Sequence, residues 1–215
     1  MSMRDISIVP YHKEDYDSIC RLLVESFQGK FHSLVTLDDE DMIELLSKTW
    51  LNGYEGASEN QMVVKENGEM IGTIFLKWRD QDPTPRTTTT NLSYTTLYKQ
   101  FGFFNVCKFL LGMGMLQYQP KQKECYIEHI AIHSKYRNQG IGKLVLAWAK
   151  DFYQHSKFEQ LTLFVSAKNP AAIHLYEHAG FRIEATKYNA VRHFFFQEPY
   201  WHYMTWRDET SEKTY

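Results

Sequence analysis

A strand, a loop with two glycines and the start of a helix follow one another in residues 125–142. This succession limits the possible folds more than any other stretch. In a regular strand the β-branched residues Ile130 and Ile132 share one face with Glu128, because side chains alternate. Beyond residue 142 the apolar residues recur at helical intervals instead. The loop between the two elements reads Arg137-Asn138-Gln139-Gly140-Ile141-Gly142. The stretch therefore predicts a strand–loop–helix unit.

The loop leaves backbone N–H groups free at the start of the helix. Together with the helix dipole, these groups suit a phosphate or pyrophosphate. Gly140 and Gly142 permit a positive φ, and they let an anion approach the main chain without meeting a Cβ. A helix-entry turn whose glycines only fit the chain explains the same pattern. Taken alone, the loop favours this second interpretation.

A second informative stretch, residues 169–181, follows an apolar strand candidate at Leu161 to Val165. Asn169 suits the N-cap of a helix, and Pro170 suits its first position. Gly180 closes that helix at the C′ position. The stripe of apolar residues along the helix consists of Ala172, Leu175, Tyr176 and Ala179. The stretch therefore predicts a strand followed by a short capped helix.

Together the two stretches resemble the GNAT superfamily of acyl-CoA-dependent N-acyltransferases. The first matches the family's R-x-x-G-x-G motif at Arg137, Gly140 and Gly142, and the second matches N-x-x-A-x-x-L-Y-x-x-x-G-F from Asn169 to Phe181. Two ordered motifs are more specific than either alone. The resemblance covers residues 123–188 and, in outline, the flanks. It implies an α/β protein of GNAT type, with a mixed, mostly antiparallel sheet flanked by helices.

The resemblance also implies acetyl-CoA as co-substrate, an amine as acceptor and no metal. Backbone N–H groups from Arg137 to Lys143 would hold the pyrophosphate. The backbone from Ile130 to Ile132 would pair with the pantetheine arm where the sheet splays, and Asn169 would lie near that arm or a bound water. The cofactor-binding residues expected on this basis are Ile130, Ala131, Ile132, Arg137, Asn138, Gln139, Gly140, Ile141, Gly142, Lys143 and Asn169.

Two residues are expected to carry the chemistry of acetyl transfer. An alkylammonium with a pKa of about 10.4 must lose a proton before it attacks. Glu128, where some members of the family carry a glutamate, is the candidate base; the alternative is a carboxylate paired with Lys or Arg at the strand edge. Tyr176 stands where the family has its general acid for the departing thiolate, and the alternative is a core tyrosine.

Four histidines near these residues are expected to be structural. His129 points away from Glu128 if the strand is regular, and His133 caps the loop after the strand. His174 and His178 face solvent on the helix beside Tyr176. None of the four is a predicted catalytic residue.

The chain before residue 123 fits the same fold in outline. It opens with a strand from Ile6 to Pro10, a helix from Tyr16 that Gly29 ends, and a second helix from Asp38. Two strands, Met62 to Lys65 and Met70 to Trp78, then form a hairpin around Asn67-Gly68. The expected order is similar to the opening of a GNAT domain.

Residues 80–121 are a departure, because the family commonly passes from the third to the fourth strand through a short turn. A loop rich in Pro and Thr leads into one or two helices between Leu92 and Leu116. The favoured interpretation is a helical insertion that buries its aromatic face against the domain or a second subunit. The alternatives are a lid or wall over the acceptor site, and an amphipathic helix on a membrane surface.

The last part of the domain is predicted to add three strands, at Phe181 to Tyr188, Val191 to Phe196 and Tyr200 to Trp206. Core or dimer packing accounts for most of the aromatic rings there, so a homodimer is one expectation. One or two rings would line the acceptor pocket. Residues 1–207 are expected to form a single domain, with 208–215 as a polar tail.

The composition limits which other classes of function are possible. A net charge of −2 provides no basic field for nucleic acid, and a content of 43% hydrophobic and 23% charged residues is typical of a folded protein. Three cysteines without C-x-x-C spacing and no N-terminal signal favour the cytoplasm. The longest apolar stretch, 101–116, is too short and interrupted to span a membrane. The alternative to an enzyme is a non-catalytic acyl-CoA-binding or regulatory module with the same fold.

Overall fold

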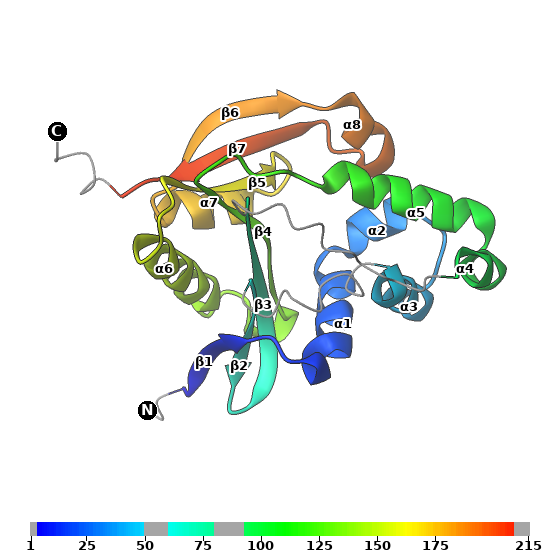
Figure 1. Cartoon of the computed structure of the whole chain (residues 1–215), viewed down its shortest axis with the longest axis horizontal. Coiled ribbons are helices and arrows are strands. Elements are labelled where there is room, and N and C mark those ends of the chain that lie inside the picture. The colour runs from blue at the N-terminus through cyan, green and yellow to red at the C-terminus, as the bar shows by residue number, and fades with distance from the viewer. Residues whose placement is uncertain (1–3, 50–59, 80–92, 209–215) are drawn as a thin grey trace.

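Within residues 4–49, 60–79 and 93–208, which the computed structural model describes, seven strands form one mixed sheet (Figure 1). The strand order is β1-β2-β3-β4-β5-β7-β6, and only β4 and β5 run parallel. The strands are β1 (Ile6–Pro10), β2 (Gln61–Glu66), β3 (Glu69–Trp78), β4 (Glu124–Ile132), β5 (Gln160–Ser166), β6 (Arg182–Tyr188) and β7 (Tyr200–Trp206). The prediction of a mixed, mostly antiparallel sheet is confirmed.

The helices gather in two groups on opposite sides of the central strands (Figure 1). One group consists of α6 (Ile141–Gln154) and α7 (Pro170–His178). The other consists of α1 (Tyr16–Ser26), α2 (Gln28–Leu34), α3 (Asp39–Thr49), α4 (Tyr94–Phe101), α5 (Phe103–Leu116) and α8 (Ala190–Phe196). Two single-turn 3-10 helices, η1 (Lys13–Asp15) and η3 (Ser134–Tyr136), complete the description.

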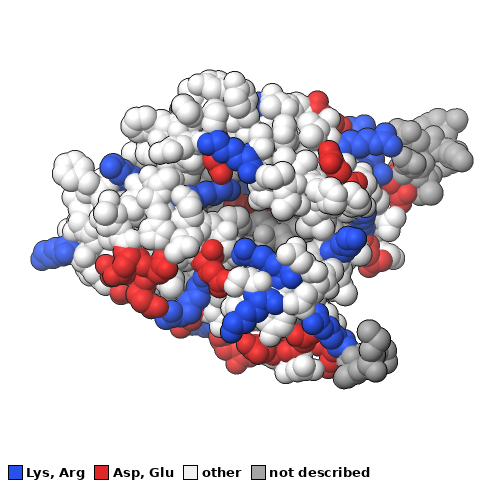
Figure 2. Space-filling view, turned by 180° about the vertical axis from the view of Figure 1, so that it is seen from behind, with Lys and Arg blue, Asp and Glu red and all other residues white. Residues whose placement is uncertain are grey.

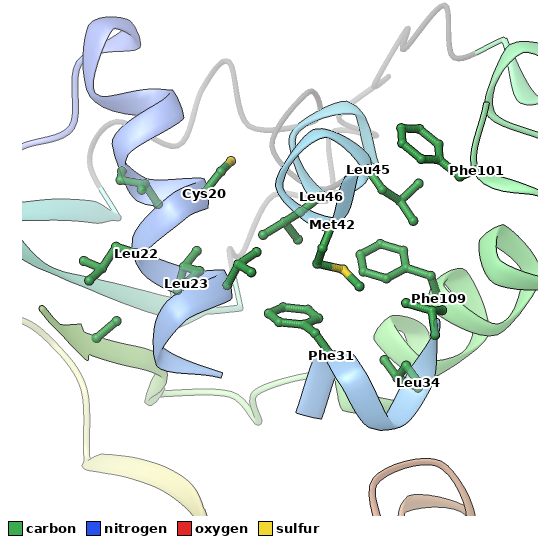
Figure 3. Close-up of a cluster of buried hydrophobic side chains, with 14 of the residues drawn as sticks. Cys20, Leu22, Leu23, Phe31, Leu34, Met42, Leu45, Leu46, Phe101 and Phe109 are labelled. Atoms are coloured by element: carbon green, nitrogen blue, oxygen red, sulfur yellow. The ribbon is translucent and has the colours of Figure 1, made fainter. Parts of the chain in front are cut away.

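Each group of helices has its own hydrophobic core. On the side of α6 and α7, Val145 and Leu146 pack with Leu161 and Met204 from the sheet. On the other side the buried side chains come almost entirely from helices, and Figure 3 shows them converging: Leu22 and Leu23 of α1, Phe31 of α2, Met42 and Leu45 of α3, Phe101 of α4 and Phe109 of α5. The sheet therefore separates two cores, and the one formed mainly by α1–α5 and α8 is called the second core below.

The insertion before the fourth strand is helical, as predicted. Gly102, with φ +83°, separates α4 from α5. Leu97, Phe101, Val106 and Phe109 are buried in the second core, which supports the interpretation of the insertion as packed structure. The Pro- and Thr-rich loop expected before α4 and the tail beyond residue 208 lie outside the described residues.

Several local signals fold as predicted. Asn67 and Gly68 have positive φ values of 52° and 84°, as a two-residue type I′ hairpin turn requires. Asn169 caps α7, because its Oδ1 accepts a hydrogen bond of 3.1 Å from the backbone N–H of Ala172. Gly180 follows the helix at φ +84°. These short-range signals fix the ends of the elements.

Two predictions of secondary structure are wrong. Gly29 does not end a helix but lies inside α2, a helix that was not predicted. The burial of Phe31 and Leu34 outweighs the cost of about 1 kcal/mol for a helical glycine there. Residues 191–196 form α8 and not a strand. Asn189 begins this helix by accepting a 2.9 Å hydrogen bond from the N–H of Arg192, and Phe196 joins the second core.

Candidate active site

The strands β4 and β5 part in the middle of the sheet. Their parallel pairing ends at Ile127 and Leu163. At the same point β4 carries a β-bulge, because Phe75 of β3 pairs with His129 and Leu76 pairs with Ile127, which leaves Glu128 as the extra residue. Beyond the bulge β4 stays with β3, whereas β5 stays with β7. The predicted splay is present, and it is centred on Glu128.

A cavity of about 470 Å³ occupies this splay. Its walls come from β4 and β5, from α7, from α1 and α2, from the end of α5, and from α8 with the start of β7. Four predicted site residues line the cavity together: Glu128, Ile130, Asn169 and Tyr176. Met113 and Leu116 line it as well, so the insertion also serves as a wall, which was one of the alternatives.

The bulge changes the expected orientation of two side chains. Glu128 and His129 do not point to opposite faces: Glu128 approaches Lys77 and His129 stacks on Phe75, two residues on one face of β3. His129 is buried, and burial lowers its pKa to about 3, so the ring is neutral near pH 7. The prediction that His129 lies opposite Glu128 is therefore wrong, because the strand is not regular there.

Glu128 is mostly buried, with 15% of its side chain exposed. Its Oε2 lies 3.6 Å from the ammonium nitrogen of Lys77 and has no hydrogen-bond partner within the described part of the chain. Burial raises the pKa of this carboxyl, and Lys77 opposes that rise. A carboxylate with a raised pKa in the wall of a cavity is suited to accept a proton.

Tyr176 lies on α7, at the wall of the cavity opposite the helices α1 and α2. Burial raises the pKa of its phenol to about 12, so the hydroxyl keeps its proton over the neutral range. The centroid of its ring lies 6.0 Å from the ring centroid of Phe181, which is itself buried. The hydroxyl is therefore a hydrogen-bond donor on a supported ring.

The other histidines are placed as expected. The Nδ1 of His133 accepts a hydrogen bond from the N–H of Lys135 and so caps η3. His174 and His178 lie on the exposed surface of α7, with ring centroids 3.9 Å apart. None of the three lines the cavity.

The predicted pyrophosphate loop lies at the exposed start of α6, outside the walls of the cavity. Asn138 and Gly140 adopt positive φ, at 59° and 84°. The first helical hydrogen bond runs from the N–H of Leu144 to the carbonyl of Gly140 at 3.1 Å, so the N–H groups of residues 141–143 precede the helical ladder. Those three groups are available to an anion.

Two residues of this loop, Gly142 and Arg137, have structural roles that were not expected from the sequence. Gly142 is helical, and a Cβ there would lie 2.9 Å from Cδ2 of Leu175, so its glycine allows α6 and α7 to pack closely. The backbone N–H of Arg137 donates to the carbonyl of Ser134 at 3.3 Å, and its Nε donates to the carbonyl of Ile132 at 2.9 Å. Arg137 thus ties the loop to the end of β4.

The edge of β4 beyond the bulge completes the coenzyme side of the splay. Residues 130–132 pair with β3 on one edge, and their other edge faces the gap toward β5. Ile130 lines the cavity, whereas the side chain of Ala131 is buried in the second core. An extended ligand can pair with such an edge as a strand does.

Four charged residues of the cavity wall, Lys30, Lys168, Arg192 and Glu198, were not predicted from the sequence. Lys30 lies on α2 and Arg192 on α8. Both belong to segments whose secondary structure was assigned wrongly. The available signal was a single cation inside an otherwise apolar or aromatic run, as in Val191-Arg192-His193-Phe194.

Three general observations bear on function. Among the described residues, no group of three or more His, Cys, Asp or Glu side chains could hold a metal ion. No helix in the described part of the chain is long and apolar enough to cross a membrane. On the face shown in Figure 2, basic and acidic side chains both occur, with uncharged surface between them.

Comparison with known proteins identifies the fold. The model of the acetyltransferase (GNAT) family matches residues 16–181. An N-acetyltransferase from Staphylococcus aureus Mu50 superposes with a TM-score of 0.64 at 17% identity, covering 93% of this chain and 100% of that chain. A GCN5-related N-acetyltransferase from Kribbella flavida gives 0.59 at 14%, covering 94% and 98%. The structure of yncA from Salmonella typhimurium with its cofactor acetyl-CoA gives 0.54 at 17%, covering 95% of each chain.

A search of curated protein sequences found no match. The similar structures share too little sequence to show more than the fold. The match to the family model, however, extends over most of the chain and includes both motifs and the splayed strands between them. The chain therefore belongs to the GNAT family of acetyltransferases, and acetyl-CoA is its co-substrate.

Proposed function

We propose that the protein is an N-acetyltransferase that moves the acetyl group of acetyl-CoA to a primary amine by direct attack, within a single domain of residues 1–207. The observation that carries the proposal is that Glu128 and Tyr176 line one cavity at the point where β4 and β5 separate. One residue accepts a proton and the other donates a hydrogen bond, as acyl transfer to an amine requires.

Acetyl-CoA fits the splay in two respects. The N–H groups of residues 141–143 would bind its pyrophosphate, since free N–H groups at a helix start favour an anion. The edge of β4 from Ile130 to Ile132 would pair with the pantetheine arm, although Arg137 already occupies the carbonyl of Ile132. Asn169 lines the cavity, but its Oδ1 caps α7, so only its amide NH₂ would face the arm.

Glu128 would act on the amine. The substrate ammonium gives a proton to the carboxylate, directly or through a water, and the freed nitrogen attacks the thioester carbon. Burial raises the pKa of Glu128, which makes this transfer less unfavourable than it is to an exposed carboxylate.

Tyr176 would act on the leaving group. As the carbon–sulfur bond breaks, the phenol donates a hydrogen bond to the sulfur and then supplies its proton. The pKa of about 12 for this tyrosine exceeds the usual value of about 8.5 for a thiol, so the phenol acts first as a hydrogen-bond donor and gives up its proton only as it takes another from the attacking nitrogen. The attacking nitrogen still carries one proton more than the amide product, and this proton replaces the one that Tyr176 gives to sulfur. The proton taken up by Glu128 returns to solvent, and coenzyme A leaves as the thiol.

The experiment is an assay of thiol release from acetyl-CoA with a panel of primary amines. The panel covers amino acids, polyamines, aminoglycosides and peptides, and a reaction without amine serves as the blank. We expect at least one class of amine to release coenzyme A in amounts equal to the acetylated product. If calorimetry shows that acetyl-CoA binds while no amine releases thiol, the protein is instead a non-catalytic acyl-CoA-binding module.

A further inference from the structure

Arg192 is a buried cation in the cavity wall without an acidic partner. It is 9% exposed, and no carboxylate of the described residues lies within ion-pair distance of it. Its Nε and one terminal nitrogen reach only the carbonyl oxygen of Met115, at 3.4 and 3.5 Å. A guanidinium has five N–H donors, so most of the hydrogen-bonding capacity of Arg192 is not used by these two long contacts.

A second cation contacts the same aromatic ring as Arg192 does. The ammonium of Lys30 lies 4.6 Å from the centroid of the Trp201 ring, and the guanidinium carbon of Arg192 lies 4.8 Å from the same ring. Burial and the charge of Arg192 lower the pKa of Lys30, against the effect of Glu198. Glu198 is the nearby acid, with its Oε2 4.0 Å from the nitrogen of Lys30. Lys30 and Arg192 therefore share this part of the cavity with one carboxylate, that of Glu198. A third cation, Lys168, lines the cavity as well and donates to the carbonyl of Gln197 at 2.8 Å.

The cavity is polarised between this cationic end and Glu128. Tyr126 connects the two: burial raises the pKa of its phenol, the charge of Glu128 raises it further, and the charge of Arg192 lowers it. The charges of Arg192 and Glu128, which are opposite in sign, thus act on one hydroxyl group. Arg192, Glu128 and Tyr126 all line the same cavity. A ligand in this cavity therefore meets both the carboxylate of Glu128 and a surplus of positive charge.

We propose that the acceptor is a small molecule that bears a carboxylate as well as its primary amine, as an amino acid does. Arg192 and Lys30 bind the carboxylate against Trp201, and the amine lies at Glu128. The planar fork of a guanidinium matches the two oxygens of a carboxylate, and a buried cation is strongly stabilised by such a partner. This inference rests on the proposed function, because it names the acceptor of that same site.

A phosphate of the coenzyme is a less suitable occupant for the cationic end. The N–H groups at the start of α6, which suit a pyrophosphate, lie outside the cavity walls, whereas Arg192 and Lys30 lie within them. The cationic end is built from α2, α8 and the start of β7, on the side of the sheet opposite α6 and α7. The geometry therefore assigns these cations to the acceptor.

The test compares acceptors that differ only in the carboxylate. For each amino acid that the enzyme acetylates, kcat/KM is measured for the acid, its carboxamide and the decarboxylated amine. The variants are Arg192→Gln, Arg192→Lys and Lys30→Gln. Arg21→Gln is the matched control, since Arg21 forms an exposed ion pair with Glu40 on the surface of α1. Circular dichroism checks that each variant folds. If Arg192→Gln does not fold, the comparison of acceptors is made with Lys30→Gln.

We expect the acid to be the best acceptor of each set. Arg192→Gln should lower kcat/KM for the acid by about 10- to 100-fold, mainly through KM, and leave the carboxamide nearly unchanged. Arg192→Lys should retain part of the preference, and Arg21→Gln all of it. The inference is overturned if the parent enzyme uses acid and carboxamide equally, if it uses only amines without a carboxylate, or if Arg192→Gln lowers both acceptors alike.

A binding measurement separates this inference from the proposed function. If no amine is acetylated, the coenzyme A complex is titrated calorimetrically with N-acetyl amino acids and with their carboxamides. Binding of the acids alone supports a carboxylate site in a protein that lacks catalysis. Equal binding of the two sets, or binding of neither, overturns the site.

Discussion

The ammonium of Lys77 on β3 lies 3.6 Å from the Oε2 of Glu128 on β4, across the two strands that meet at the bulge. No other ion pair of Glu128 occurs among the described residues. Two opposing influences therefore act on the candidate base: burial raises its pKa, and Lys77 limits the rise. The pair sets the pH at which Glu128 becomes able to accept a proton.

Removing Lys77 should move the pH dependence of catalysis. Because kcat/KM falls when Glu128 is protonated, its acidic limb follows the pKa of this carboxyl. Lys77→Met removes the influence that lowers the pKa, so the limb should shift to higher pH by about one unit or more. The measurement is a pH profile of kcat/KM, with Lys65→Met, which breaks the remote pair with Asp15, as control. An unshifted limb would show that Glu128 is not the base.

Tyr176→Phe should lower kcat by about 100-fold while the affinity for acetyl-CoA changes little, because only the donor to the departing sulfur is lost. Steady-state kinetics and calorimetric titration with acetyl-CoA measure the two effects. Tyr153→Phe is a matched control, since Tyr153 is buried on α6 and does not line the cavity. Equal turnover in the Tyr176 variant would remove this tyrosine from the mechanism.

The neutral, buried His129 should make the fold sensitive to acid. Its native pKa of about 3 lies below the usual value of about 6.5, so below pH 6.5 the unfolded chain gains a proton that the native state does not. As the pH is lowered from 6.5 to 3, the free energy of unfolding therefore falls by up to about 1.4 kcal/mol per pH unit. His129→Phe should flatten this dependence in urea unfolding at pH 7 and pH 4.5. His155→Phe, at an exposed histidine, should not, and a similar effect of both changes would contradict the assignment.

Two glycines of α5 should respond to alanine in opposite ways. At Gly114 a Cβ meets no atom within 4 Å, so Gly114→Ala should raise the free energy of unfolding by about 0.5–1 kcal/mol. At Gly112 a Cβ would lie 2.4 Å from Cδ2 of Leu34, so Gly112→Ala should lower it by about 1–3 kcal/mol. Chemical denaturation of the two variants measures both. Changes of the same sign would contradict the close packing of α5 on α2.

The sequence predicts those parts of the fold that depend on short-range signals. The Asn67-Gly68 turn, the Asn169 cap and Gly180 mark the ends of their elements in both the sequence and the structure. The motif positions likewise indicated where β4 and β5 splay. Local geometry alone is enough for these features, because a positive φ or a capping oxygen favours few residue types.

Other features depend on contacts that the sequence does not contain. Helices α2 and α8 exist because Phe31 and Phe196 find room in the second core, and neither has a strong propensity of its own. The bulge at Glu128 arises from the pairing of β4 with β3, and it reversed the expected orientation of His129. Arg192 and Lys30 were not predicted to line the cavity for the same reason, because the secondary structure of their segments was predicted wrongly.

The division of the interior by the sheet has a consequence for how such a chain can change. Phe31 and Phe196 belong to the packing behind the acceptor wall, whereas Val145 and Leu146 anchor the helix that begins at the glycine loop. Substitutions at well-separated positions without shared neighbours alter stability almost independently. Under the proposed function, substitutions in the second core could therefore change the acceptor that relatives of this protein use, while the core beneath α6 keeps the proposed acetyl-CoA site unchanged.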